Sequence, residues 1–250
     1  MADRDIAADR LAELKKARDD LARFLMVYKF GLDEIMTKIT ILKEEFTYIH
    51  EYSPIEHVTS RLKSPESILA KAQRKGAPPT LEGIRKAVSD IAGVRVTCSF
   101  ISDTYRVADL LSSQADVTVL EVEDYIANPK PNGYKSLHLL VQIPVYMSDR
   151  VEHVPVEVQI RTIAMDFWAS LEHKIYYKYN RAVPPTLLQE LKEAAEVASR
   201  LDVKMEQLHE EVHRAAGRAP GEPPESPPLE LPLSDPLVQA LLAPPPSTSD

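Results

Sequence analysis

The chain has 250 residues, of which 44% are hydrophobic, enough for one domain with a real core plus extensions. Its net charge of -8 argues against a binder of duplex nucleic acid. It has no apolar run long enough for a membrane span, and its first residues lack the apolar stretch of a signal peptide, so neither feature is expected. Basic residues are nevertheless concentrated between residues 61 and 95, so polyanionic small molecules remain candidate ligands. The single cysteine, Cys98, lies in an apolar strand pattern and is expected to be a buried thiol of a cytoplasmic protein.

Residues 5–50 carry apolar side chains at spacings of three, four and seven, which predicts one long helix, or two with a break at Gly31. This arm packs either against its own domain or against another subunit.

The next segment contains a candidate anion site. Alternation over residues 57–63 predicts a strand, and Ser64 followed by Pro65 predicts the capped start of a helix. The alternative is a solvated basic strand edge. Four donors are expected to converge near this helix N-terminus, where the helix dipole favours an anion: Arg61, Lys63, Ser67 and Lys71.

A short helix over 81–88 and a strand over 91–100 follow. Asp90 precedes this strand and Arg95 lies five residues later, an arrangement that can hold Mg²⁺ near phosphates, although a lone Asp at a strand end is usually only a turn residue. Asp103 is expected to cap a helix that reaches Gln114, and residues 117–126 to form a third strand.

The loop over residues 129–138 is a second candidate site. Its Pro, Asn and Gly residues favour a tight turn, Tyr134 offers a ring on which a base can stack, and Lys130 offers a charge for phosphates. Taken alone, the loop fits an ordinary hairpin connection equally well.

Two further strands are predicted, over 136–146 and 154–162. His138 lies opposite the buried positions of the first strand, and Glu157, Gln159 and Arg161 alternate with apolar residues in the second. These polar residues form either the floor of a site or the solvent face of a sheet. Asp90 and Glu157 are two carboxylates that could share a divalent metal ion.

An amphipathic helix is predicted over 163–179, with Trp168 as a core residue, and a last helix over 186–214 with an apolar stripe. From residue 215 the chain is rich in proline and lacks a core pattern, which predicts disorder. Within this tail, residues 234–243 have a capped helix start and a leucine pair, and are a candidate binding segment for an unknown protein partner.

Four motifs occur in order along the chain: Arg61-Leu62-Lys63 with Ser67 and Lys71, Asp90-Ile91-Ala92-Gly93-Val94-Arg95, Asn132-Gly133-Tyr134-Lys135-Ser136-Leu137-His138, and Val156-Glu157-Val158-Gln159-Ile160-Arg161-Thr162. Through them the sequence resembles the RelA/SpoT family of (p)ppGpp synthetases, in its short, single-domain class of small alarmone synthetases. The resemblance extends from about Phe24 to Arg214.

The resemblance implies a GTP pyrophosphokinase of the stringent response, which uses Mg²⁺ to transfer pyrophosphate from ATP to the 3′-hydroxyl of GDP or GTP. The implied metal ligands are Asp90 and Glu157, with Glu157 also placed to activate the hydroxyl. The implied ATP site consists of Arg61, Lys63, Ser67, Lys71 and Arg95. The implied GDP or GTP site consists of Lys130, Asn132, Tyr134, His138 and Gln159.

The implied fold is α+β, with a mixed five-stranded sheet flanked by helices, like that of nucleotidyltransferases, and long N- and C-terminal helices. The expected organisation is a helical arm over 1–50, a synthetase domain over 51–182, a C-terminal helix over 183–214 and the tail over 215–250. Short family members commonly form homotetramers through their terminal helices, which fits the two long apolar stripes.

The family's hydrolase domain is built on a His-Asp pair, and the sequence contains no His-Asp dipeptide, so synthesis without hydrolysis is expected. The alternative function is a catalytically silent oligomer that binds nucleotides or single-stranded RNA. The two carboxylates argue against it, because binding alone does not need them and they repel phosphates in the absence of a metal. Another nucleotidyl-transfer chemistry on the same sheet is a third alternative.

Overall fold

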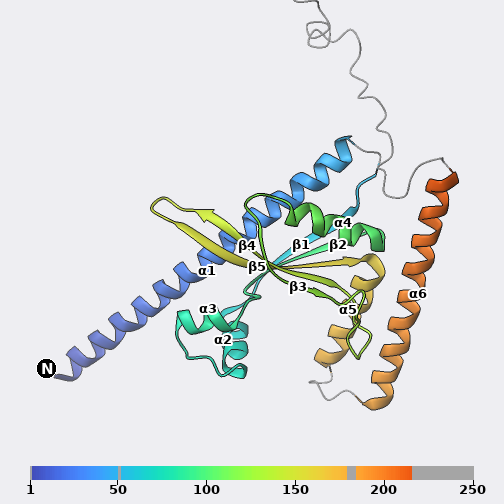
Figure 1. Ribbon diagram of the computed structural model, residues 1–250. Helices are drawn as coiled ribbons and strands as arrows, with labels where there is room; N and C mark the ends of the chain where they lie inside the picture. The colour runs from blue at the N-terminus through green and yellow to red at the C-terminus, as the bar shows by residue number, and fades with distance from the viewer. Residues whose placement is uncertain (1, 50–51, 179–183, 216–250) are drawn as a thin grey trace, which may run out of the picture.

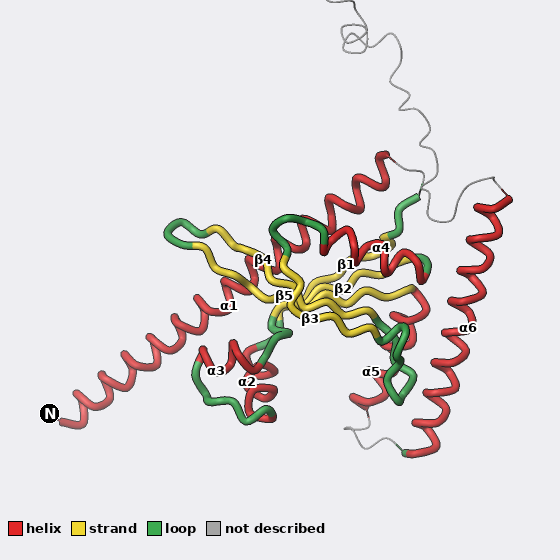
Figure 2. The backbone as a smooth tube through the Cα atoms, viewed as in Figure 1, coloured by secondary structure: helices red, strands yellow, loops and turns green. Residues whose placement is uncertain are grey.

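The computed structural model describes residues 2–49, 52–178 and 184–215, and the tail with its segment 234–243 lies outside these ranges. Five strands and six helices follow one another in these ranges (Figure 1; Figure 2). They are α1 (Ala2–Ile49), β1 (Ile55–Leu62), α2 (Pro65–Arg74), α3 (Leu81–Ala87), β2 (Ala92–Cys98), α4 (Ile101–Ser112), β3 (Thr118–Asp124), β4 (Leu137–Tyr146), β5 (Val151–Thr162), α5 (Ile163–Lys178) and α6 (Pro185–Ala215).

The strands form one mixed sheet in the order β1-β2-β5-β4-β3. The central pair β2 and β5 is parallel, and the other three pairs are antiparallel. The predicted α+β fold with a mixed five-stranded sheet is therefore confirmed. The parallel pair matters for the site, because it places residues 93–98 directly beside residues 157–162 at the centre of the sheet.

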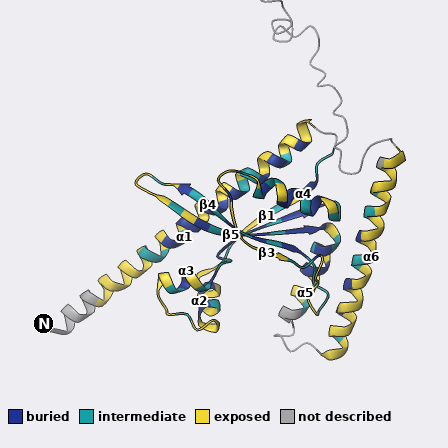
Figure 3. Ribbon diagram, in the orientation of Figure 1, coloured by how far each residue is buried: buried dark blue, intermediate teal, exposed yellow. Residues whose placement is uncertain are grey.

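One face of the sheet is covered by α1 and α4, whose apolar residues share a single core with the strands. Ile35 and Ile39 of α1 are fully buried, and β4 buries every second residue from Leu137 to Val145. Figure 3 shows that α1 projects beyond the sheet toward its N-terminus, where residues 10–19 are exposed. Among the side chains of α1 that the structure describes, those from Leu21 onward pack on the domain. None of the helices in the described ranges is both long enough and apolar enough to cross a membrane.

The break considered at Gly31 does not occur, because α1 is continuous from Ala2 to Ile49. Gly31 marks instead a point where α1 approaches β5 closely. A Cβ atom at this position would lie 2.5 Å from Cγ1 of Val154. The glycine therefore permits a close helix-to-strand approach that any side chain would obstruct.

The N-cap predicted from the sequence is correct for α2 and wrong for α4. Ser64 caps α2 as predicted, since its hydroxyl accepts a hydrogen bond from the N–H of Ser67 at 3.3 Å. The prediction of Asp103 as an N-cap is wrong, because α4 begins at Ile101. Asp103 lies in its first turn, where Oδ2 accepts a hydrogen bond from the N–H of Phe100 at 3.2 Å.

Helix α6 lies beside α5 and contacts the domain through a small apolar cluster, which includes Trp168 and Ala195, and through polar groups (Figure 1). Thr162 donates to Asp202 at 2.7 Å, and Glu206 accepts from the N–H of Ile101 at 2.7 Å. Trp168 of α5 is buried as predicted and donates to the carbonyl of Leu191. Much of the predicted apolar stripe of α6 remains exposed, including Leu201, Met205, Leu208 and Val212.

Candidate functional site

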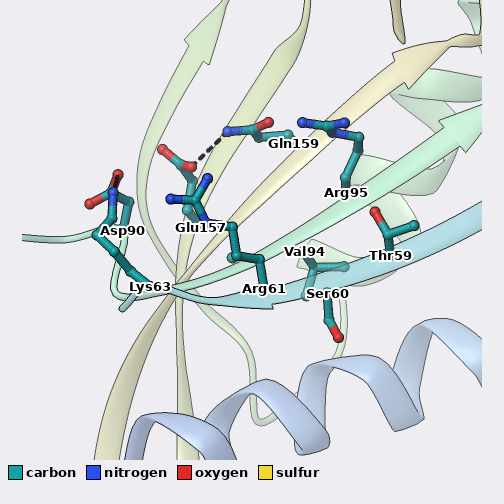
Figure 4. A pocket seen from close by; sticks show the side chains of 10 residues that line it. Thr59, Ser60, Arg61, Lys63, Asp90, Val94, Arg95, Glu157 and Gln159 are labelled. Atoms are coloured by element: carbon teal, nitrogen blue, oxygen red, sulfur yellow. Dashed lines mark hydrogen bonds and ion pairs between the residues drawn. The ribbon is translucent and has the colours of Figure 1, made fainter. Parts of the chain in front are cut away.

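The register of the sheet brings polar side chains from four strands onto one face, because residues opposite each other on neighbouring strands point to the same side. One cross-strand row consists of Arg61, Gly93, Glu157 and Leu140. The next row consists of Thr59, Arg95, Gln159 and His138. Figure 4 shows that the side chains of Arg61, Arg95, Glu157 and Gln159 project from the side of the strands that is turned away from α1.

A pocket of about 260 Å³ opens over these rows. Gly93 lies in its floor between Arg61 and Glu157, and no side chain there narrows the space. The charged and amide residues that line it are Arg61, Lys63, Asp90, Arg95, Glu157 and Gln159 (Figure 4).

Asp90 lines this pocket and is paired with two lysines. Its Oδ2 forms ion pairs with Nζ of Lys63 at 2.7 Å and Nζ of Lys71 at 2.8 Å. Burial opposes ionisation, but the hydrogen bonds and charges of the two lysines outweigh it and lower the pKa of Asp90. Its Oδ1 is buried and has no hydrogen-bond partner in the part of the chain that the structure describes. Asp90 is thus an anionic carboxylate with one oxygen available to a further positive group.

Glu157 faces the same pocket from β5. The amide of Gln159 donates to its Oε2 at 2.7 Å, and Nδ1 of His138 lies 4.0 Å from its Oε1. Two carboxylates therefore line one pocket, as the sequence led us to expect. Among the described residues, no group of three or more His, Cys, Asp and Glu side chains could hold a metal ion by itself.

Ser67 lies apart from the pocket lining. Its hydroxyl accepts a hydrogen bond from Ser64 Oγ at 3.0 Å in the first turn of α2. Of the four donors expected to converge, Lys63 and Lys71 meet at Asp90, and Arg61 lines the pocket.

The loop before β4 gathers aromatic rings beside the pocket. The ring of Tyr134 packs edge-on against His138, and its hydroxyl lies 2.8 Å from His138 Nε2. Nζ of Lys130 lies 4.1 Å from the ring centre of Tyr125 and 5.2 Å from that of Tyr134. Tyr125 was not a candidate in the sequence, and the acidic run before it gives no signal for this role.

His138 is held in its neutral form. Burial and the charges of Arg161 and Lys130 lower its pKa to about 4, against a weaker opposing effect of Glu123. A neutral imidazole has one nitrogen without a proton, and Nε2 can therefore accept the hydrogen bond of the Tyr134 hydroxyl.

Asn132, Gly133 and Lys135 build the loop and hold it against the C-terminal helices. Asn132 accepts a hydrogen bond from the N–H of Tyr134 and donates to Glu172 at 3.2 Å, and Lys135 donates to Ser199 at 2.7 Å. Gly133 has a φ of +88°, a left-handed conformation that favours glycine. The contacts of Asn132 within the loop thus hold the backbone on which Tyr134 is presented.

Two further polar residues belong to this face. Arg161 is 3% exposed and donates to Tyr134, Gln159 and Asp166. The alternation of Arg161 with Glu157 and Gln159 was its only sequence signal. Asp166 had none, because an acid in the first turn of a helix usually only complements the helix dipole.

Comparison with known proteins agrees with this geometry. Residues 60–182 match the family model described as the region found in RelA / SpoT proteins. The chain is 53% identical over 201 residues to the GTP pyrophosphokinase YwaC of Bacillus subtilis (strain 168), covering 80% of this chain and 96% of that protein. It is 42% identical over 186 residues to the GTP pyrophosphokinase YjbM of the same strain, covering 74% of this chain and 87% of that protein.

Solved structures give the same answer. Small alarmone synthetase 2 from Bacillus subtilis matches with a TM-score of 0.71 at 53% identity, over 77% of this chain and 99% of that chain. Small alarmone synthetase 1 from Bacillus subtilis, bound to its product pppGpp, matches with a TM-score of 0.73 at 41% identity, over 78% of this chain and 98% of that chain. The resemblance stated from the motifs is therefore confirmed, and the chain belongs to the RelA/SpoT family, among its small alarmone synthetases.

Proposed function

We propose that this protein is a GTP pyrophosphokinase, which transfers pyrophosphate from ATP to the 3′-hydroxyl of GDP or GTP and yields (p)ppGpp and AMP in the stringent response. The observation that carries the proposal is the meeting of Asp90 and Glu157 in one pocket, with Lys63 and Lys71 at the first carboxylate. The names of the similar proteins support it, as does a neighbouring structure bound to AMPCPP.

On the donor side, we assign Arg61 and Arg95 to the adenine, because both guanidinium groups rise from the pocket face and can stack on a purine. Lys63, Lys71 and Ser67 are assigned to the ATP phosphates. The two ammonium groups already lie together at Asp90, and the N–H groups and dipole of the first turn of α2 would favour an anion such as a phosphate.

Asp90 and Glu157 are assigned as the residues that would hold Mg²⁺. The unpaired, buried Oδ1 of Asp90 fits a hard cation, and Mg²⁺ is typically held by one or two carboxylates, with waters and substrate phosphates as its other ligands. When bound, the ion would neutralise negative charge on the phosphates.

On the acceptor side, Tyr134 is assigned to stack on guanine, with Lys130, Asn132, His138 and Gln159 around the nucleotide. Glu157 accepts the proton of the 3′-hydroxyl as the hydroxyl oxygen forms a bond to the β-phosphorus of ATP. The bond between that phosphorus and the bridging oxygen breaks, and AMP leaves with the oxygen. In such transfers the protein acts mainly by positioning and by charge neutralisation.

We further propose that the protein is a homotetramer in which the exposed apolar residues of α5 and α6 contact another copy. A groove of about 910 Å³ between these helices is lined by apolar side chains, among them Phe167, Leu171, Leu201 and Met205. A Leu201→Glu substitution should reduce the mass measured by light scattering, whereas an unchanged mass would exclude this face.

The remaining assignments rest on the sequence. We propose the division into an arm over 1–50, a synthetase domain over 51–182, a C-terminal helix over 183–214 and a tail over 215–250, whose segment 234–243 binds a protein partner. We also place the enzyme in the cytoplasm, where ATP and guanosine nucleotides are both available.

The test is chromatography of an incubation with ATP, GDP and Mg²⁺. AMP and a 3′-pyrophosphorylated guanosine nucleotide should appear together, and Glu157→Gln should abolish both. Glu82→Gln, at an exposed carboxylate on α3, is the matched control. Nucleotide binding without any product would identify a silent binding protein instead. Full turnover by Glu157→Gln would reject the assignment of that carboxylate.

A further inference from the structure

Arg161 occupies the junction between the two proposed nucleotide sites. Its side chain is 4% exposed, so its charge has almost no contact with solvent. Nη2 donates to the hydroxyl of Tyr134 and to Oε1 of Gln159, the latter at 2.8 Å, and Nε donates to Ser136 Oγ at 3.3 Å. A buried guanidinium of this kind is stable only when its donors are satisfied, and here they are satisfied by residues of the site.

Asp166 joins this junction to the donor side. Its Oδ1 lies 3.1 Å from Nη1 of Arg161 and 3.2 Å from Nη1 of Arg95. One carboxylate oxygen is therefore shared by two guanidinium groups. Burial and the charge of Arg161 lower the pKa of Arg95, while the charge of Asp166 opposes both effects. A change at either arginine therefore alters the strength of the ion pair between Asp166 and the other arginine.

Gln159 extends this link to Glu157, the carboxylate proposed to accept the proton of the 3′-hydroxyl. Its Oε1 accepts from Arg161, which leaves its Nε2 directed at Oε2 of Glu157, 2.7 Å away. The amide cannot rotate without losing both hydrogen bonds, since its oxygen would then face Glu157 and its nitrogen would face Arg161.

We propose that Arg161, held by Asp166, is a positioning residue that couples the two nucleotide sites, because it orients Tyr134 and Gln159 while sharing its carboxylate with Arg95. This inference rests on the proposed function for the identity of the two nucleotides. When adenine stacks on Arg95, the guanidinium group is held against the nucleobase and its ion pair with Asp166 is weakened. Asp166 then pairs more strongly with Arg161. The ring of Tyr134 and the amide of Gln159 are then held more firmly for the acceptor.

Coupling of this kind is measurable without turnover. Isothermal titration with GDP, alone and in the presence of AMPCPP and Mg²⁺, gives the factor by which a donor analogue changes acceptor affinity. For the wild-type protein we expect GDP to bind about fivefold or more tightly with the analogue, the lower end of typical coupling between sites. Asp166→Asn should bring this factor close to one, because a neutral amide holds neither guanidinium strongly.

Two variants complete the design. Arg161→Lys keeps the charge but cannot serve the four acceptors of the planar guanidinium, so it should also abolish the coupling and lower kcat about tenfold or more through Gln159. Asp109→Asn, at an exposed acid on α4, is the matched control and should retain the wild-type factor. Thermal unfolding of each variant shows whether it is folded. If Asp166→Asn does not fold, the coupling factor of Arg161→Lys decides whether the inference holds.

The outcomes separate this inference from the proposed function. The coupling would be overturned if GDP affinity in the wild-type protein did not depend on the donor analogue, even if product is made. It would also be overturned if a folded Asp166→Asn or Arg161→Lys variant kept that dependence. Donor-dependent GDP binding that is lost in both variants would support the coupling even if no product is formed, in which case only the proposed reaction fails.

Discussion

Gly133 offers a direct test of the acceptor loop. Its φ of +88° is unfavourable for an L-residue, and a Cβ atom there would lie 2.5 Å from Cβ of Ala195 in α6. Gly133→Ala therefore adds backbone strain of about 1–2 kcal/mol and an overpacking cost of about 1–3 kcal/mol. Both costs fall on the turn that presents Tyr134, so the KM for GDP should rise at least about tenfold, while the KM for ATP stays close to the wild-type value.

Ala195→Gly separates the two costs. It removes the clashing atom and leaves the strain, at a helix-propensity cost of about 1 kcal/mol. In a double-mutant cycle of urea unfolding, the pair should show a favourable interaction of about 1–3 kcal/mol, and the KM for GDP should recover in part. Additive free energies would refute the predicted contact. A destabilised Gly133→Ala variant with an unchanged KM for GDP would show that the loop does not hold the acceptor.

Three other substitutions test other parts of the structure. Gly31→Ala gains about 1 kcal/mol of helix propensity but forces a Cβ into Val154, so the melting temperature should fall, and a rise would contradict the close approach of α1 to β5. Gly93→Val has room for its Cβ and should raise strand stability by about 0.5–1 kcal/mol while it fills the pocket and suppresses turnover, and full activity would place the substrates elsewhere. Because burial and neighbouring cations lower the pKa of His138 to about 4, the unfolded chain binds its proton first, and stability should fall as the pH drops from about 6.5 toward 4. His138→Gln should flatten that part of the pH profile of urea unfolding, and an unchanged slope would assign the loss to other groups.

Much of the fold could be predicted from local patterns. The alternation of Leu137 and Leu139 with polar residues gave β4, and the pairing of Ser64 with Pro65 gave the start of α2. Asp103 was misplaced, because an acid at the cap and an acid in the first turn leave nearly the same pattern in the sequence. Gly31 was ambiguous for a related reason, since a glycine in a helix marks either a break or a close contact, and no local pattern shows that Val154 lies against it.

The sequence by itself determined the family, the order of the motifs and the face on which Glu157, Gln159 and His138 lie, because each depends on residues that are close along the chain. Only the tertiary structure brought Lys63 and Lys71 to Asp90, and joined Arg161 and Arg95 through Asp166. These contacts depend on strand order and register. A parallel pairing of β2 with β5 leaves no local trace in either strand, because it is decided by how the whole sheet packs against α1 and α4.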